Sequence, residues 1–227
     1  MPKHGKRYNE LATKINRSQV YSLAEALNLI ISHKTEKFDA GVEIHLRLGI
    51  DTKKSDQQIR STITLPHGTG KSKRVAAFVE ADKEKDAREA GADLVGGEDL
   101  INEIKKTEKT DFAVAVATPA MMPKIAVIAK ILGTRGLMPS PKNETVGPNV
   151  AKIISELKKG KITFKSDNTG NIHQLIGKIS FGQDKLLDNA ETFLEAVRKA
   201  KPSSSKGTYL KHAVLCTSMG PSIKLAV

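Results

Sequence analysis

Gly70-Lys71, followed by the hydroxyl of Ser72, matches the end of a phosphate-binding P-loop. A complete P-loop also needs a glycine five positions before Gly70, because that glycine lets the backbone amides wrap around the phosphates. This sequence has Leu65 at that position. A P-loop must also run into a helix whose N-terminus faces the anion, whereas residues 75–79, Val-Ala-Ala-Phe-Val, are typical of a strand. The motif therefore does not predict nucleotide hydrolysis.

Other side chains that could carry chemistry are few or scattered. The six histidines lack metal-ligand spacing, and the single cysteine, Cys216, has no second thiol to join it. Cys216 cannot form an internal disulfide, which agrees with a reducing compartment, and we interpret it as a small buried residue of a strand. The nucleophile elbow G-x-S-x-G is absent from the sequence. We expect no catalytic residue, no metal site and no cofactor.

The composition indicates an anionic partner. The formal net charge is +12 and the isoelectric point is about 9.7, and nucleic acid is the usual partner of such a chain. A membrane surface is the alternative, but no apolar run is long enough to cross a bilayer. The start, "MPKHGKRYNE", lacks the apolar segment of a signal peptide. With no Trp, 3 Tyr and 6 Phe, recognition should depend on shape, phosphates and backbone contacts.

The two ends of the sequence share one pattern. A capping box at Ser22 and Glu25 predicts a helix over 22–33. From Phe38 the pattern has period two up to Ile50, which predicts a half-exposed strand with Glu43, His45 and Arg47 on its polar face. Further elements expected at the two ends are strands over 60–65, 161–165, 172–181 and 208–217 and a helix over 184–201.

The middle of the sequence alternates strand and helix. Strands are expected over 75–80, 93–95 and 111–118, and helices over 82–90, 98–107, 119–132 and 150–159. This alternation predicts a parallel sheet covered by helices on both faces. The whole chain is therefore expected to form a discontinuous α+β outer domain, residues 1–68 plus 160–227, with an α/β domain inserted at 69–159.

The basic excess is uneven between these two expected domains. Residues 69–159 contain 16 Lys and Arg against 13 Asp and Glu, a net charge of +3, which leaves +9 of the +12 in the outer domain. A run of charges is often just a solvated face. An asymmetry this large favours a nucleic-acid site on the outer domain.

Several sequence blocks, collinear over essentially the whole chain, resemble the bacterial large-subunit ribosomal protein L-one family, the protein of the mobile side stalk. The blocks are "KHGKRY", "KFDAGVEIHLRLGID", "KSDQQIR", "LPHGTGK..RVAAF", "AGADLVG", "DFAVAVATPAMM", "LGTRGLMPSPK", "KITFKSDNTGNIH" and "TSMGPSIKL". The resemblance implies that the inserted domain is a Rossmann-like three-layer α/β domain. It also implies that "LPHGTGK" forms part of a hinge, whose expected residues are Pro66, Gly68, Gly70 and Gly160.

The resemblance further implies a structural protein without catalysis. Its expected partners are the stalk region of 23S rRNA, deacylated tRNA at the exit site, whose release it would help, and its own operon messenger, which it would repress. The protein is expected to be cytoplasmic, in the large ribosomal subunit, without a membrane partner, and monomeric when free of the ribosome. The alternative is an α/β enzyme that binds a nucleotide in the middle domain, although this domain lacks G-x-G-x-x-G after a strand.

The expected RNA-binding residues come from three segments. The last segment combines a hydroxyl at Ser218, a flexible thioether at Met219 and a glycine at 220 that permits close approach of a ribose or phosphate. Gly41, His212 and Ser218 depart from the residues common in the family at these positions. The full expected set is Lys37, Phe38, Lys165, Asp167, Gly170, His173, Lys178, Thr217, Ser218, Met219, Gly220 and Pro221.

Overall fold

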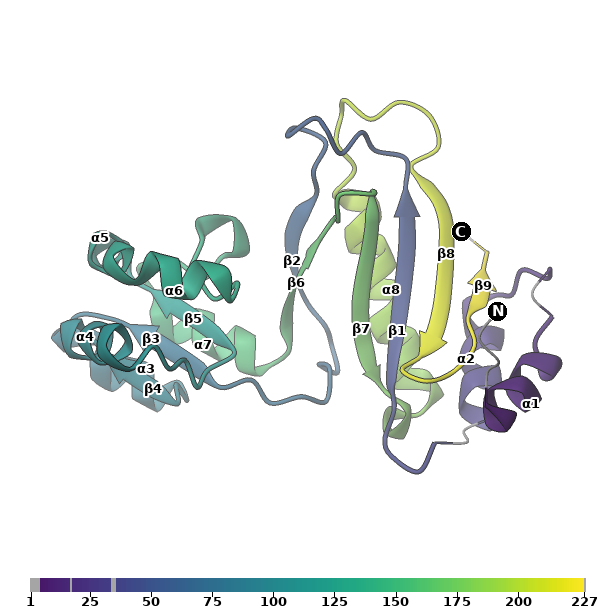
Figure 1. The fold of residues 1–227 in the computed structure, drawn as a ribbon, viewed down its shortest axis with the longest axis horizontal. Helices are drawn as coiled ribbons and strands as arrows, with labels where there is room; N and C mark the ends of the chain where they lie inside the picture. The colour runs from purple at the N-terminus through teal and green to yellow at the C-terminus, as the bar shows by residue number, and fades with distance from the viewer. Residues whose placement is uncertain (1–4, 17, 34–35, 227) are drawn as a thin grey trace. The chain divides into compact units, whose positions relative to one another are not determined.

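The chain forms two compact units. A computed structural model describes residues 5–16, 18–33 and 36–226 (Figure 1). The outer unit comprises Met1–Gly70 and Thr163–Val227, and the inner unit comprises Lys71–Ile162. The insert expected from the sequence, 69–159, differs from the inner unit by two residues at its start and three at its end. The block "KHGKRY" begins at Lys3 and His4, which lie outside the described residues.

The outer unit is built on an antiparallel four-stranded sheet. Its order is β7 (Asn171–Lys178), β1 (Gly41–Leu48), β8 (Leu210–Thr217) and β9 (Ile223–Leu225). In β1 the predicted alternation is confirmed, because Val42, Ile44, Leu46 and Leu48 are buried while the residues between them are partly or fully exposed. The sheet therefore has one core face and one open face.

Two helices cover the core face. Helix α2 (Leu23–Ser32) contacts β8 and β9, and helix α8 (Gln183–Lys199) contacts β7. The capping box at Ser22 and Glu25 is present, with both reciprocal hydrogen bonds. Each helix buries one apolar stripe, as its period predicts: Ala26, Leu27 and Ile30 of α2, and Leu186, Ala190, Phe193 and Val197 of α8.

A second, two-stranded sheet pairs β2 (Arg60–Thr64) with β6 (Lys161–Lys165). Phe164 of β6 is buried and packs edge-to-face on Phe193 of α8, with ring centroids 5.6 Å apart. Strand β6 begins in the inner unit and ends in the outer unit. It is therefore one of the two places where the chain passes between the units.

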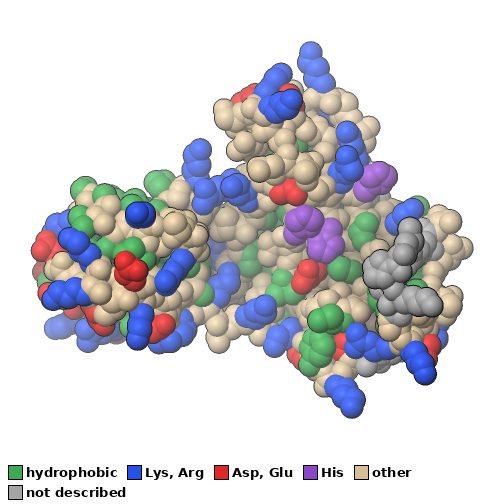
Figure 2. Space-filling view, in the orientation of Figure 1, with side chains coloured by type: hydrophobic (Ala, Val, Ile, Leu, Met, Phe, Trp, Pro, Cys, Tyr) green, Lys and Arg blue, Asp and Glu red, His purple; other side chains and the backbone are tan. Residues whose placement is uncertain are grey.

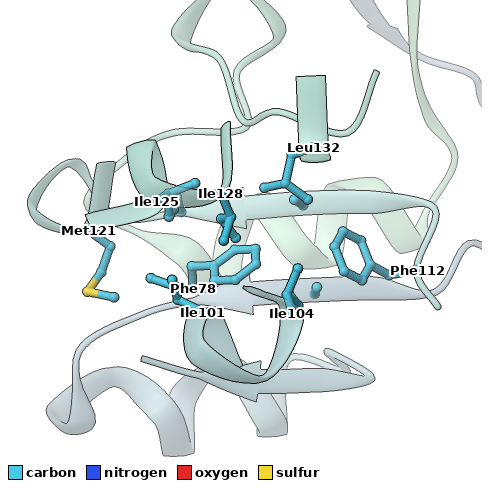
Figure 3. Close-up of a cluster of buried hydrophobic side chains, with 11 residues drawn as sticks. Phe78, Ile101, Ile104, Phe112, Met121, Ile125, Ile128 and Leu132 are labelled. Carbon is cyan, nitrogen blue, oxygen red and sulfur yellow. The ribbon is translucent and has the colours of Figure 1, made fainter. Parts of the chain in front are cut away.

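The inner unit is a three-layer α/β arrangement. Its parallel sheet has the order β4 (Leu94–Gly96), β3 (Val75–Phe78) and β5 (Val114–Ala117). Alternate residues of β3 enter separate cores: Ala76 and Phe78 on one face, Val75 and Ala77 on the other. Figure 3 shows the first core, where helix α4 (Glu98–Thr107) and the segment 119–134 contribute Ile101, Ile104, Ile125, Ile128 and Leu132. Helices α3 (Glu84–Glu89) and α7 (Val150–Lys158) supply the second core.

Several details depart from the sequence-based expectations. The helix expected over 119–132 is broken into two 3₁₀ turns, Pro119–Met121 and Ala126–Ile128, and two short helices, α5 (Met122–Ile125) and α6 (Ala129–Thr134). Pro123 lacks the N–H that a continuous helix starting at Pro119 would use at that position, whereas Pro119 stands at the first helical position, where Pro is tolerated. Strand β7 ends at Lys178, and a 3₁₀ turn follows at Ile179–Phe181.

One helix and one strand were not expected from the sequence. Helix α1 (Lys6–Lys14) buries Leu11, a single residue in a polar segment, so it shows no apolar stripe in the sequence. Strand β9 is three residues long, too short to show a pattern of period two in the sequence.

In the described part of the chain, no helix combines the length and the apolar character that a membrane span requires.

Candidate nucleic-acid interface

The open face of the outer sheet carries polar side chains in rows across the strands. Arg47 lies opposite Asn171 and His212, and His45 lies opposite His173 and Val214. In the next rows Glu43 faces Leu175 and Cys216, and Gly41 faces Lys178. In Figure 2 histidine side chains gather over these strands on the face turned to the viewer. The open face is thus a largely polar strip along β1, interrupted by Leu175 and Val214.

Exposed apolar side chains stand at one end of this strip. Phe38 is 49% exposed and Met219 is 56% exposed. The two segments that carry them are neighbours, because the amide of Ser218 donates to the carbonyl oxygen of Gly41 at 3.0 Å. Lys178 lies opposite Gly41, and its Nζ is 3.9 Å from Oδ2 of Asp39. The segments that carry Lys37, Phe38, Lys178 and Met219 are therefore neighbours at this end of the strip.

The segment from Thr217 to Pro221 divides into inward and outward residues. Ser218, Met219 and Gly220 are at least partly exposed, whereas Thr217 and Pro221 are buried. Thr217 donates from its hydroxyl to a carboxylate oxygen of Glu36 at 3.4 Å, so its side chain faces the core. The amide of Gly220 donates to the carbonyl oxygen of Thr217 at 3.2 Å. Thr217 and Pro221 shape the turn that presents Met219.

A tight turn at Asp167–Asn171 forms the other end of the strip. The carboxylate of Asp167 accepts hydrogen bonds from the amides of Thr169 and Asn171 at 2.8 and 2.7 Å. Burial raises the pKa of Asp167, but the bonds from Asn171 and Thr169 outweigh it and bring the pKa to about 2. Gly170 is buried with φ of +81°, and a Cβ there would lie 3.4 Å from the carbonyl oxygen of Leu48. Lys165 is exposed.

His173 lies between these two ends, in direct contact with a residue that the sequence analysis did not select. The Nδ1 atoms of His45 and His173 are 2.8 Å apart, and Nε2 of His45 is 3.1 Å from Sγ of Cys216. The period of β1 placed His45 on the polar face, but a single sequence does not reveal the register between strands 128 positions apart. The missed members of the strip, for the same reason, are Glu43, His45, Arg47 and His212.

The expected hinge residues occupy turns. Gly68, Gly70 and Gly160 have φ of +63°, +72° and +108°, where a glycine is favoured. Gly68 and Gly70 precede the crossing from the outer to the inner unit between Gly70 and Lys71, and Gly160 follows α7. Pro66 is exposed at the start of the first turn. Movement at these positions stays a prediction.

The alternative of a nucleotide site in the inner unit has little support. The strand expected after Ser72 is confirmed as β3, so Gly70-Lys71-Ser72 does not lead into a helix. Among the described residues no group of three or more His, Cys, Asp or Glu side chains is placed to hold a metal ion.

Comparison with known proteins decides the family. Residues 30–221 match the ribosomal protein L1p/L10e family. The chain belongs to this family. Its relatives include the large ribosomal subunit protein uL1 of Thermosipho melanesiensis, 50% identical with 99% of this chain and 97% of the relative covered. Proteins of the same name from Fervidobacterium nodosum and Solibacter usitatus are each 48% identical, over 99% and 98% of this chain and 96% and 94% of their own length.

Family membership confirms the prediction of a large-subunit ribosomal protein and sets the enzyme alternative aside. RNA binding and a part in translation are properties of the ribosomal protein L1p/L10e family. The mixed α/β architecture with several sheets is compatible with it. The open strip is accordingly the first place to look for an RNA contact.

Proposed function

We propose that the protein binds the stalk region of 23S rRNA through the open strip of the outer unit, within the cytoplasmic large ribosomal subunit. One observation carries the proposal: Phe38 and Met219 stand exposed at the same end of the strip as Lys37 and Lys178. Exposed rings and thioethers offer packing surfaces to ribose and unstacked bases, and lysines offer charge to phosphates. The net charge of +9 outside residues 69–159 supports the same surface.

The two compact units would serve as separate domains, with RNA binding in the outer one and a hinge at Pro66, Gly68, Gly70 and Gly160. The inner unit would contribute to contact with deacylated tRNA at the exit site and to its release. The same strip would bind a segment of the protein's own operon messenger that mimics the stalk RNA. By this binding the protein would repress translation of that messenger. These roles rest on the resemblance to the family, as does the expected monomeric state off the ribosome.

The direct test is equilibrium binding of the full chain to a 23S stalk fragment, with an unrelated rRNA stem-loop of equal length as control. Specific binding should weaken with salt, because Lys and Arg contacts release counterions from phosphates. Contact with about five phosphates gives a log–log slope of about −4. Equal affinity for both RNAs would contradict specific recognition, and a flat salt response would contradict a basic interface.

The finer roles need separate measurements. One shared site predicts that a substitution such as Met219→Asp weakens binding to the stalk fragment and to the operon leader by the same factor. A variant that lost one RNA and kept the other would contradict a shared site. Crosslinking of inner-unit lysines to exit-site tRNA on the ribosome tests the tRNA contact, and sedimentation of the free protein tests the monomer.

A further inference from the structure

Side chains from three strands form a chain of polar contacts across the middle of the open strip. The rings of His45 and His173 meet edge-on, with centroids 4.9 Å apart and Nδ1 atoms at 2.8 Å. Nε2 of His45 lies 3.1 Å from Sγ of Cys216 and 3.8 Å from Oε2 of Glu43. At the other end, Nε2 of His173 lies 3.7 Å from Oδ2 of Asp167. Two imidazoles thus lie in series between two carboxylates.

The hydrogen bonds of this chain have a defined direction when both rings are neutral. Burial, and then the charge of Glu43, raise the pKa of Cys216 to about 11, so the thiol keeps its proton. The thiol can donate to Nε2 of His45, whose proton then lies on Nδ1 and is donated to Nδ1 of His173. The remaining proton of His173, on Nε2, faces Asp167.

One added proton reverses this direction. A charged His173 carries protons on both nitrogens, so its Nδ1 donates to Nδ1 of His45. The proton of His45 moves to Nε2, which faces the thiol sulfur and the carboxylate of Glu43. The added charge then lies between Asp167 and Glu43. Binding of a second proton by the pair is unfavourable. Burial, and then the charge of His173, lower the pKa of His45, and the smaller effect of Glu43 in raising it does not compensate.

We propose that His45 and His173 form a single phosphate-binding position within the RNA interface, which becomes competent when the pair shares one added proton. The proposal rests on the proposed function and deepens it. Without that proton, the rings are neutral and the carboxylates of Glu43 and Asp167 repel a phosphate placed over them. With it, one unit of positive charge is added at the surface, where the side chain of His173 is 56% exposed.

Three further charged or titratable residues lie near the pair on the open face. Arg47 lies two residues along β1 and stays charged. Lys224 of β9 lies opposite Val214, the residue beside His45 on β8. His212 of β8 lies opposite Arg47 and is a third imidazole on the open face. It therefore needs its own control, His212→Gln.

The first experiment needs no RNA. Nitrogen NMR of the full chain, labelled at its histidines, follows the tautomer and charge of His45 and His173 from pH 8.5 to 5. The expected result is one proton shared by the two rings, with His45 moving from the Nδ1–H to the Nε2–H tautomer as His173 charges. Independent titration of the two rings, with an unchanged His45 tautomer, would overturn the coupling.

The second experiment measures affinity for the 23S stalk fragment at pH 8 and pH 6. Uptake of one linked proton should tighten binding roughly threefold to tenfold at pH 6, within the limit of about tenfold per pH unit. The salt slope should steepen by about 0.7–0.9, the equivalent of one more phosphate contact. In His45→Gln both changes should disappear. His67→Gln should keep them, because His67 bonds Asp188 of α8 at 3.0 Å, away from the open face.

His173→Gln gives the same test if His45→Gln fails to fold, since either substitution breaks the pair. Two results would overturn the phosphate position and leave the proposed function standing. One is equal affinity at pH 8 and pH 6, and the other is a pH dependence that persists unchanged in His45→Gln and in His173→Gln. A dependence abolished by His212→Gln instead would also overturn it. No specific binding at either pH would overturn both proposals.

Discussion

The side-chain amide of Asn189, which has no exposed surface, donates to the carbonyl oxygen of Gly68 at 2.9 Å. The same nitrogen donates to the carbonyl oxygen of Ile176 at 2.8 Å, and the Asn189 oxygen accepts from the amide of His67 at 3.1 Å. One buried side chain on α8 thus holds both β7 and the turn that precedes the first crossing between units. This side chain therefore satisfies three backbone groups of the outer unit: the amide of His67 and the carbonyl oxygens of Gly68 and Ile176.

Asn189→Leu should therefore destabilise the protein. The substitution leaves the buried carbonyl of Ile176 and the partly buried backbone groups of His67 and Gly68 without these partners, at a cost of about 2–4 kcal/mol. Urea unfolding monitored by circular dichroism measures the change. Asp188→Ala is the matched control, since its exposed contact with His67 should be worth less than about 1 kcal/mol. Equal losses in the two variants would contradict a special role for Asn189.

Asp167→Ala should destabilise the turn at the end of the strip in a pH-dependent way. The carboxylate accepts amide bonds that favour its charged form, and its partial exposure limits their value to about 1–2 kcal/mol. Because the pKa in the folded protein is lowered to about 2, this stability is present above the unfolded pKa near 4 and is lost as the pH falls toward 2. Thermal melts of both proteins should differ at pH 7 and converge near pH 2. A constant difference would rule out the ionised turn.

Met219→Asp should weaken RNA binding and leave folding unchanged. A carboxylate in place of the thioether removes apolar packing and adds repulsion from phosphates, which together should cost about 2–4 kcal/mol of binding. Filter binding to the stalk fragment measures the loss. Val127→Asp is the control, because Val127 is similarly exposed, at 61%, but lies in the inner unit. Unaltered affinity in folded Met219→Asp would remove this residue from the interface.

The outer unit should bind RNA without the inner one. Replacing residues 71–160 by a Gly/Ser linker keeps β6 and every residue of the strip, and the closure of the gap costs modest loop entropy. The shortened protein should melt cooperatively and bind the stalk fragment within about tenfold of the full chain, or 1.4 kcal/mol. Complete loss of specific binding in a folded protein would mean that recognition needs both units.

The sequence predicts those features that depend on local pattern. The alternation of β1, the capping box at Ser22 and the strand–helix order of the middle segment follow from side-chain spacing, and the structure confirms them. Helix α1 was missed because its single buried residue, Leu11, creates no periodic stripe.

The candidate site was predictable only in part, because it depends on register. His173 was selected, yet its partner His45 is 128 positions away and is brought opposite it by strand pairing. Thr217 was selected as a contact, but its position on β8 is opposite Val42, so it faces the core. A one-residue shift in pairing would exchange these roles, and nothing in a single sequence fixes that shift.

The order of the strands has a consequence for synthesis. Strand β1 lies between β7 and β8, so its sheet cannot close until residue 217 has been made, whereas the inner unit is complete at Ile162. At about 5–20 residues per second, the first 70 residues wait roughly 7–30 s for their partners. Until β7 has been made, at residue 178, Val42, Ile44 and Leu46 have no partner strand in this sheet. The inner unit is therefore expected to fold first, and the exposed early strand is the segment of the nascent chain most in need of chaperone protection.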